Sequence, residues 1–597
     1  MAHNSGDSVV AQCSELIDSL IQATLKGKIR SKAQVYRQLD QGLATGTGEI
    51  FERCLAERMQ AAEQNTSFKG PRIVRALQMV EGEWANLQKA RQVEEKVSTV
   101  TAQISEATGE EQLDTLLKLL DPNQEQPPTR DQLKQLATSL EAEGNETLSK
   151  GIVSGLAAFQ NLEGELVSWM YEAGGRDIGF GSEKRRGPWQ YWAKRVDFAV
   201  PQQLFDVLAK GESVTELARG WSRLDESSWV QLAILLHYLK QGLVKWFDQQ
   251  PYNINLGKKL SYSTFLIFAS IEASLAQGFS RPYLSRGSFQ LMQHSLRSFA
   301  QRDDFPLYGG VFAAFDGGYL QDTLDYFGEP LKQVPGTQEK ARLLTLLGYS
   351  QRTLGRYEQA LEFHQEALEI ATEAGDQPCV IASFNHLARV HVLQKNYGEA
   401  KNFSQRALIM ARQQGDRPGE ANALVNYGYS EVFAARDMDT PDLSVYEQAI
   451  GYLERGRELA ETLGDFQSKA LAYNSMGIAY SISGQSGLAI ETLEKALPLT
   501  QAAGNVYLQG VTCTYLAEAQ RALENVEAAV LYGALGMYLL HQIGSSEWRQ
   551  GAGLLRVISG ELGKEGFERV LQGQRRQVIH WIGVDGFDYL GTLLAEY

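Results

Sequence analysis

The chain has 597 residues, of which 43% are hydrophobic and 22% are charged, a composition typical of a globular protein with packed cores. Its formal net charge of −15 argues against a nucleic-acid-binding protein, because such proteins carry a basic footprint. The four cysteines are far apart and form no CxxC pair, which argues against a disulfide framework and favours a reducing, cytoplasmic compartment.

Residues 1–165 are predicted to form polar helices. Residues 70–107 have few helix breakers and apolar residues at helical spacing, which indicates an amphipathic helix in a helical hairpin or a coiled-coil pair. Turn formers and prolines between Asp121 and Pro128 predict a loop, after which a helix begins at Thr129. The region is a candidate for self-association. Its first residues contain no basic segment followed by an apolar core, so no secretory signal is expected.

Residues 166–300 differ in composition, because six of the nine tryptophans lie there. We predict a compact helical domain in which tryptophans form an aromatic core; the alternative is that they surround a ligand. The most apolar stretch, residues 262–279, is interrupted by Glu272 and several serines, which favours a buried helix over a membrane span. The six tryptophans are Trp169, Trp189, Trp192, Trp221, Trp229 and Trp246.

A linker rich in glycine and charge, residues 174–188, leads into this domain. It contains the basic run Lys184–Arg186, which Trp189 and Trp192 follow. Clustered cations beside amphipathic aromatic side chains suit the surface of an anionic membrane, and a solvated hinge is the alternative interpretation.

Between about residue 330 and residue 545 the sequence repeats about every 40 residues, and a period of this length indicates stacked supersecondary units. Each unit closes with a glycine and a polar residue. These glycines, spaced 40, 49, 40 and 40 residues apart, are Gly375, Gly415, Gly464, Gly504 and Gly544. Small residues also recur inside the units, where they allow two antiparallel helices to approach closely. One such set is Gly348, Ala388, Gly428, Gly477 and Ala517.

Over residues 330–547 this pattern resembles the tetratricopeptide repeat (TPR) family in its long form of about 40 residues. The third unit departs from the family's pattern, because it carries nine extra residues within Ala434–Val445, either a binding loop or a tolerated surface loop. Residues 316–325 resemble half of a degenerate repeat, and residues 548–597 are predicted to cap the stack. Phrases such as GPWQYWAKRV and SSEWRQGAGLL are similar to uncharacterised cyanobacterial repeat proteins, which suggests a source more than a function.

The resemblance implies that the first helix of each unit lines a concave face. Asparagine can donate to and accept from the backbone of an extended peptide, and arginine can bind a carboxylate bidentately. We therefore hypothesise that a protein or peptide segment with acidic or C-terminal carboxylate groups binds there; the alternative is that these are ordinary solvated positions. The family's inward positions correspond to Arg342, Thr345, Tyr349, Arg352, Asn385, Arg389, Asn422, Tyr429, Asn474, Thr514, Glu518 and Arg521.

No motif for catalysis, a cofactor or a metal is evident in the sequence. Residues 174–187 are glycine-rich but lack the GxxxxGK[ST] pattern, and no GxSxG or HExxH sequence occurs. His386 and His391 are five residues apart, whereas zinc ligands on one helix face are four apart. We therefore predict no catalytic, cofactor-binding or metal-binding residues.

The sequence thus predicts an all-α protein with a helical N-terminal region (residues 1–165) and a tryptophan-rich helical domain (166–300). An α-solenoid, the TPR superhelix (301–547), and C-terminal capping helices (548–597) follow. The expected function is non-catalytic: a protein-interaction scaffold, adaptor or assembly factor. Two alternatives remain open, a regulatory sensor that responds to a peptide or metabolite and an enzyme with its site in the tryptophan-rich domain.

Overall fold

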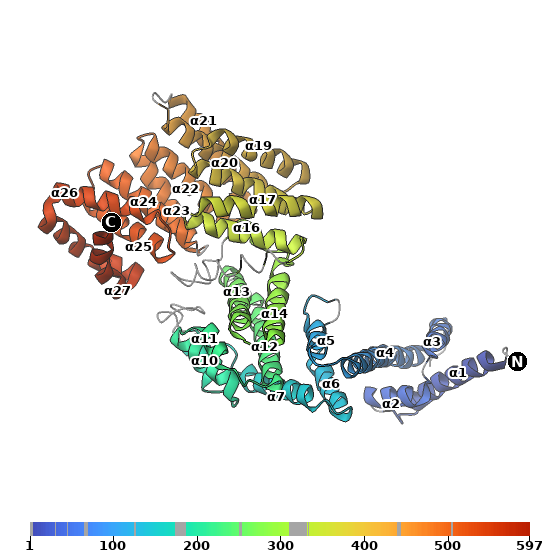
Figure 1. Ribbon diagram of the computed structural model, residues 1–597. Coiled ribbons are helices and arrows are strands. Elements are labelled where there is room, and N and C mark those ends of the chain that lie inside the picture. The colour runs from blue at the N-terminus through green and yellow to red at the C-terminus, as the bar shows by residue number, and fades with distance from the viewer. Residues whose placement is uncertain are drawn as a thin grey trace. The chain divides into compact units, whose positions relative to one another are not determined.

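Every element in the described part of the chain is an α-helix, so the predicted all-α class is confirmed (Figure 1). The computed structural model describes residues 4–29, 31–44, 46–64, 70–124, 127–172, 187–249, 254–309, 327, 331, 334–438, 443–502 and 505–597. By their internal contacts the residues divide into two compact units, which are 1–119 with 128–149, and 120–127 with 150–597.

The first unit has a core of its own. The helix predicted for residues 70–107 is confirmed as α4, which packs against α1, α2, α3 and α6. Ile17, Phe51 and Leu77 are fully buried in this core, because apolar side chains share one face of each helix. The predicted helix start is also confirmed, since Thr129 and Gln132 form a capping box at α6. The helices are α1 (Asn4–Leu25), α2 (Lys32–Gly42), α3 (Gly48–Glu63), α4 (Gly70–Glu106), α5 (Glu110–Leu120) and α6 (Arg130–Ala142).

In the tryptophan-rich part of the second unit the helices pack against one another. Four of the six tryptophans, Trp169, Trp189, Trp192 and Trp229, are buried, which confirms the predicted aromatic core. Trp192 lies edge-on to Phe205 with the ring centroids 5.6 Å apart. The helices are α7 (Glu146–Glu163, which begins in the first unit), α8 (Ser168–Glu172), α9 (Trp189–Ala193), α10 (Ala199–Lys210), α11 (Val214–Gly220), α12 (Glu226–Asp248), α13 (Ile254–Gly278) and α14 (Pro282–Ala300).

Two glycines of α7 allow α12 to approach very closely. A Cβ atom on Gly151 would lie 2.8 Å from the Ser227 carbonyl oxygen, and one on Gly155 would lie 2.9 Å from that of Gln231. Such contacts are shorter than van der Waals packing permits, so any larger residue at either position would separate the two helices.

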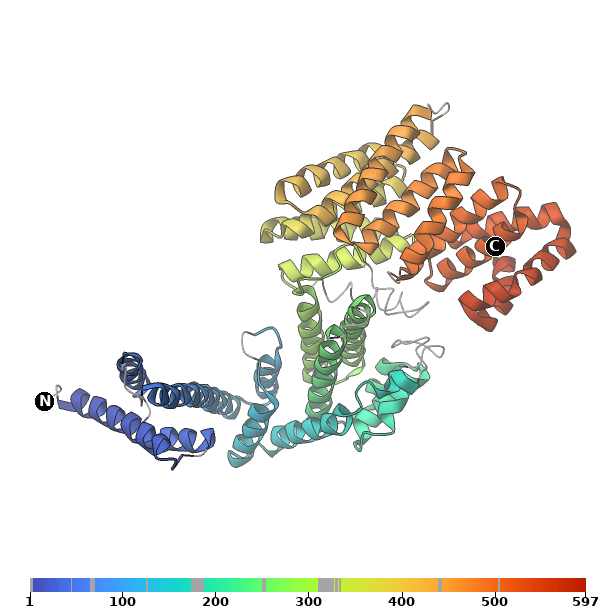
Figure 2. The ribbon, with the colours of Figure 1, turned by 180° about the vertical axis from the view of Figure 1, so that it is seen from behind.

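Five helix pairs follow and stack in chain order (Figures 1 and 2). Within each pair the two helices pack against each other, and the second helix packs against the first helix of the next pair. The first helices also contact one another in succession, from α16 through α18, α20 and α22 to α24, and we call these five helices the inner layer. The pairs are α16 (Gln338–Thr353) with α17 (Tyr357–Ala374), α18 (Gln377–Leu393) with α19 (Tyr397–Gln414), α20 (Arg417–Arg436) with α21 (Leu443–Leu463), α22 (Phe466–Ile482) with α23 (Ser486–Ala502), and α24 (Val506–Ala522) with α25 (Val526–Gln542).

The repeated glycine ends one helix, and the polar residue after it starts the next. Gly415 ends α19 with φ at 70°, a left-handed conformation that glycine adopts without steric cost. The next residue, Asp416, starts α20 by accepting a hydrogen bond from the Gly419 N–H at 2.9 Å. Gly375 with Asp376 and Gly464 with Asp465 repeat this arrangement, whereas Gly504 lies outside the described residues.

The insert predicted in the third pair lies partly within its two helices. Part of the predicted insert is helical, because Ala434 to Arg436 belong to α20 and Leu443 to Val445 belong to α21.

Beyond the pairs, α26 (Trp548–Gly573) and α27 (Arg575–Glu596) both pack against α25. Each of the two is interrupted at a glycine with positive φ, Gly563 or Gly583.

Three predictions fall on residues that are not described. These are the basic run Lys184–Arg186 within the 174–188 linker, the degenerate repeat at 316–325, and the centre of the insert at 439–442. Among the helices that are described, we find none with the length and apolar character needed to cross a lipid bilayer.

Candidate functional site

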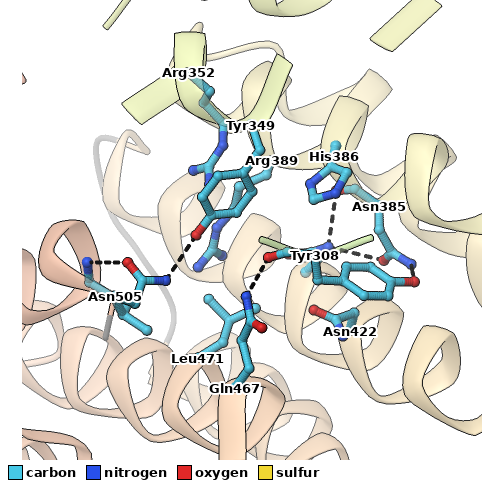
Figure 3. A pocket seen from close by; sticks show the side chains of 12 residues that line it. Tyr308, Tyr349, Arg352, Asn385, His386, Arg389, Asn422, Gln467, Leu471 and Asn505 are labelled. Atoms are coloured by element: carbon cyan, nitrogen blue, oxygen red, sulfur yellow. Dashed lines mark hydrogen bonds between the residues drawn. The ribbon is translucent and has the colours of Figure 1, made fainter. Parts of the chain in front are cut away.

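The inner layer encloses a small polar cavity of about 40 Å³, which we call the central cavity (Figure 3). All five inner helices contribute side chains to its wall, and Asn505, which caps the start of α24, contributes as well. The lining residues are Tyr308, Tyr349, Arg352, Asn385, His386, Arg389, Asn422, Asn426, Gln467, Leu471, Asn505 and Leu508.

The cavity is small because the first and last helix pairs meet across it. The Asn505 side-chain amide, at the start of α24, donates to the Tyr349 hydroxyl of α16 at 3.1 Å. Arg389 of α18 donates to the Ser475 hydroxyl of α22 at 3.2 Å. The two residues of the first contact are 156 positions apart in the sequence, and those of the second are 86 apart. The contacts therefore join distant helices of the inner layer to one another.

The structure brings five of the twelve predicted inward residues together around the central cavity. They are Tyr349, Arg352, Asn385, Arg389 and Asn422. A sixth, Tyr429, lies beside them, with its ring centroid 3.5 Å from the guanidinium carbon of Arg389.

The other six predicted residues form hydrogen bonds or ion pairs away from the central cavity. Asn474 donates to the Thr512 hydroxyl at 2.9 Å and so links α22 to α24. Thr345 and Thr514 bond to carbonyls one turn earlier in their own helices. The remaining three pair with charged or amide groups: Arg342 with Asp376, Glu518 with Gln550, and Arg521 with Glu561. Nine of the twelve are buried, namely Thr345, Tyr349, Arg352, Asn385, Arg389, Asn422, Tyr429, Asn474 and Thr514.

A turn from outside the repeats occupies part of the inner face. The residues Pro306 to Gly309, which we call the inserted turn, are closed by a hydrogen bond from the Gly309 N–H to the Pro306 carbonyl at 2.9 Å. His386 lies 2.7 Å from the Leu307 carbonyl through Nε2, and Gln467 donates to the Tyr308 carbonyl at 2.6 Å. Inner-layer side chains therefore hold main-chain carbonyls of another segment, and Figure 3 shows the bond from Gln467 to Tyr308.

Tyr308 is the residue of the inserted turn that enters the cavity wall. Asn385 donates to its hydroxyl at 3.3 Å, and burial raises the pKa of Tyr308 well above its ordinary value. Sequence inspection missed Tyr308 because it lies before the repeats. It also missed Asn426, although this residue is one helical turn after Asn422 and therefore shares its face.

Two stacked histidines lie behind the cavity wall. The rings of His364 and His386 are 4.8 Å apart and nearly parallel. Burial lowers the pKa of His386 to about 3, and burial together with His386 lowers that of His364 well below its ordinary value. Both rings are therefore neutral near pH 7. Gly348 leaves the space for His364, since a Cβ there would lie 2.6 Å from the ring.

A second buried polar cluster joins three helices of the tryptophan-rich domain. Lys240 of α12 lies 3.6 Å from the Glu272 carboxylate of α13, and their side chains are 4% and 1% exposed. Ser295 of α14 donates to Glu272 at 2.5 Å and accepts from Lys240. A neighbouring cavity measures about 10 Å³, which is too small for a substrate. We therefore interpret this cluster as a structural link between the helices.

Metal chemistry receives no support from the described residues, in which no group of three or more histidine, cysteine or acidic side chains could hold an ion. All four cysteines are buried and unpaired. Burial raises the pKa of Cys379 and of Cys513 to about 12, so neither is a reactive thiolate near neutral pH.

Comparison with known proteins identifies the repeat but not a ligand. The model of the tetratricopeptide repeat matches residues 339–413, and no curated protein matches the chain. The similarity to cyanobacterial repeat proteins stays a prediction.

Among solved structures, one similar chain is a Rap protein in complex with Competence and Sporulation Factor (15% identity, 73% of this chain and 99% of that one, TM-score 0.35). Aspartyl phosphate phosphatase F from Bacillus subtilis (16%, 68% and 91%, 0.30) and yeast Tom70 (12%, 92% and 96%, 0.31) are similar at the same level. Likenesses of this size say nothing about the ligand or activity of this chain. The match to the tetratricopeptide repeat thus covers residues 339–413, which span most of α16 to α19, and the three helix pairs after them have the same paired packing.

Proposed function

We propose that the chain is a non-catalytic interaction protein, a scaffold, adaptor or assembly factor that binds a segment of a protein partner on its inner layer. The observation that carries this proposal is the inserted turn. His386 and Gln467 hold two consecutive main-chain carbonyls of residues outside the repeats, at 2.7 and 2.6 Å. Main-chain recognition of this kind accepts many sequences, which suits a surface that binds a partner's backbone.

The charges of the inner layer suggest the chemistry of the partner. Arg352 and Arg389 line the central cavity, and within the described residues neither forms an ion pair with a carboxylate. Arginine binds carboxylates through two parallel hydrogen bonds. A partner segment with acidic side chains or a C-terminal carboxylate would supply the missing negative charge.

The partner segment must take the place of the inserted turn, because about 40 Å³ leaves no room for even a short peptide beside it. The turn and the partner therefore compete for the same donors. This competition lowers the apparent affinity for the partner, because the partner binds only those molecules in which the inserted turn has left the inner layer.

Because of this competition, a change that weakens the inserted turn should increase partner binding. Tyr308→Ala removes the turn's buried anchor and should increase partner capture from an extract of the native organism several-fold, on the order of the lost hydrogen bond and buried ring. Tyr397→Ala is the matched control: Tyr397 also bonds through its hydroxyl, to Asp437 at 2.7 Å, but lies on the outer helix α19. Unchanged or reduced capture by a folded Tyr308→Ala variant would contradict the proposal.

A regulatory sensor remains a second candidate because of the contacts across the central cavity. The bonds from Asn505 to Tyr349 and from Arg389 to Ser475 join distant helix pairs, so a ligand that inserts between them would open the inner layer. Small-angle scattering with and without the partner measures this. A radius of gyration that does not change on binding would reject the sensor and leave the scaffold.

A further inference from the structure

Among the described residues, no carboxylate forms an ion pair with either of the two buried arginines of the central cavity. Arg352 is 5% exposed and Arg389 is 8% exposed. Within the described part of the chain, Nε of Arg352 and Nη1 of Arg389 have no hydrogen-bond partner. An unpaired charge in a protein interior is strongly unfavourable, so two of them in one cavity call for a counter-charge.

The surrounding aromatic rings compensate for part of this charge. The guanidinium carbon of Arg352 lies 4.6 Å from the ring centroid of Tyr349 and 5.7 Å from that of Tyr507, and Arg389 stacks on Tyr429 at 3.5 Å. Ring faces attract cations, but far less strongly than an anion does. Within the described residues, Nε of Arg352 and Nη1 of Arg389 therefore remain as unused N–H donors, whereas Nη2 of Arg389 donates to Ser475.

The acid that acts on both arginines, Glu547, can offset at most one of their two positive charges. Its carboxylate accepts a hydrogen bond from the Tyr507 hydroxyl at 2.9 Å, and it forms no ion pair with either arginine in the described residues. Burial raises the pKa of Glu547 above its ordinary value, although Tyr507 and the two arginines oppose this. The cavity therefore keeps an excess of positive charge.

We propose that the central cavity binds one small oxyanion, with the size and charge of inorganic phosphate or sulfate, between Arg352 and Arg389. Two guanidinium groups match a dianion in charge, and their N–H donors match oxygen acceptors in geometry. A volume of about 40 Å³ corresponds to the space of about three water molecules, close to that of a tetrahedral oxyanion. A nucleotide or a peptide residue is too large. A partner's carboxylate would compete with the oxyanion for the same two arginines, so the proposal concerns the chain without a bound partner segment.

The oxyanion would also stabilise the closed inner layer. Arg352 belongs to α16 and Arg389 to α18, and Arg389 already reaches Ser475 of α22. Figure 3 shows both arginine side chains beside Tyr349, whose hydroxyl bonds to Asn505. An anion held there would connect the first two helix pairs to the last two.

Equilibrium dialysis of the full chain against radiolabelled inorganic phosphate tests the proposal. We expect one phosphate per chain, and at least about tenfold weaker binding by Arg352→Gln and by Arg389→Gln, because each removes charge-assisted hydrogen bonds. The matched control is Arg406→Gln: Arg406 also stacks on a ring, that of Phe384 at 4.3 Å, but is exposed and outside the cavity. Equal losses in all three variants, or no stoichiometric binding, would overturn the proposal.

Competition distinguishes the chemistry of the anion. Unlabelled sulfate should displace the labelled phosphate, whereas acetate and chloride at equal ionic strength should not. Equal displacement by acetate would show a site for carboxylates and refute the preference for a tetrahedral oxyanion.

A measurement on the wild-type chain removes any dependence on the folding of the variants. Crystals grown without phosphate or sulfate and soaked in selenate should show an anomalous peak between the two guanidinium groups. A melting temperature raised by about 3 °C at a hundredfold excess of phosphate over its Kd should accompany it. A selenate peak at another place, with none in the cavity, would overturn the assignment.

Discussion

Replacing Lys240 by methionine tests how the buried Lys240–Glu272 pair contributes to stability. Burial raises the pKa of Glu272 from 4.5 to about 7, although Lys240 and Ser295 act to lower it. Folding therefore takes up a proton between these two pH values, and the stability of the wild-type protein decreases as the pH rises through this window. A pKa shift of this size corresponds to about 3 kcal/mol.

The effect of the substitution should depend strongly on pH. Without the lysine the carboxylate has lost its counter-charge, so the pKa of Glu272 should rise further. At about pH 6 both proteins hold a neutral carboxyl, and the electrostatic cost of the change is close to zero. Above about pH 7 only the wild type ionises Glu272, and the difference grows by about 1.4 kcal/mol per pH unit. At about pH 9 Lys240→Met should be less stable by about 3 kcal/mol, as expected for a broken buried pair.

Guanidinium unfolding at the two pH values, followed by tryptophan fluorescence, measures this difference, since Trp229 lies on the same helix as Lys240. Lys240→Met combined with Glu272→Leu removes both charges and should recover most of the loss at high pH. The matched control, Lys495→Met, breaks an exposed pair with Glu491 and should show no such pH dependence. Equal losses at both pH values, or a double variant no more stable than the single one, would refute the reasoning.

The repeat helices and the first unit give three further predictions. Asp416→Ala removes the N-cap of α20 and should cost about 1 kcal/mol in urea unfolding; wild-type stability would contradict the capping role. Gly428→Ala places a Cβ 2.7 Å from the Ala449 carbonyl and should destabilise by about 1–3 kcal/mol in the same assay. Gly451→Ala, where a Cβ would meet nothing within 4 Å, should be neutral or stabilising, and similar losses in both would argue against close packing. Residues 1–165 should self-associate in light scattering, and a monomer at every concentration would reject that expectation.

Local features of the fold could be predicted from the sequence because they depend on neighbouring residues. A glycine followed by an aspartate, as at Gly415 and Asp416, ends one helix and starts the next through bonds within a few residues. The small residues that allow the paired helices to approach closely are likewise local in effect, because Gly428 lies against the backbone of the next helix.

The central cavity could not be predicted in the same way. Its closure depends on the accumulated rotation of four successive helix pairs, which brings Tyr349 to Asn505 over 156 residues. The inserted turn adds Tyr308 from outside the repeats, and no spacing rule connects it with Asn385 or Gln467. For this reason Asn385 and Arg389, predicted to line a peptide-binding groove or else to be ordinary solvated positions, are in fact buried.

Of the buried pair Lys240–Glu272, only Glu272 stands out in the sequence. Glu272 stands out as a charge in the apolar residues 262–279, which predicts that it needs a partner if it is buried. Lys240, its partner, lies on the preceding long helix, and the sequence does not specify which face of α12 meets α13.

Photo-crosslinking can show whether a partner segment binds on the inner layer. A photoreactive amino acid replaces either Leu471, which lines the central cavity, or Leu488, which is 45% exposed on the outer helix α23. The full chain is then irradiated in an extract of the native organism. We expect position 471 to crosslink a distinct partner, more strongly when Tyr308 is replaced by alanine, and position 488 not to crosslink it. Crosslinking of the partner from position 488 alone would contradict it.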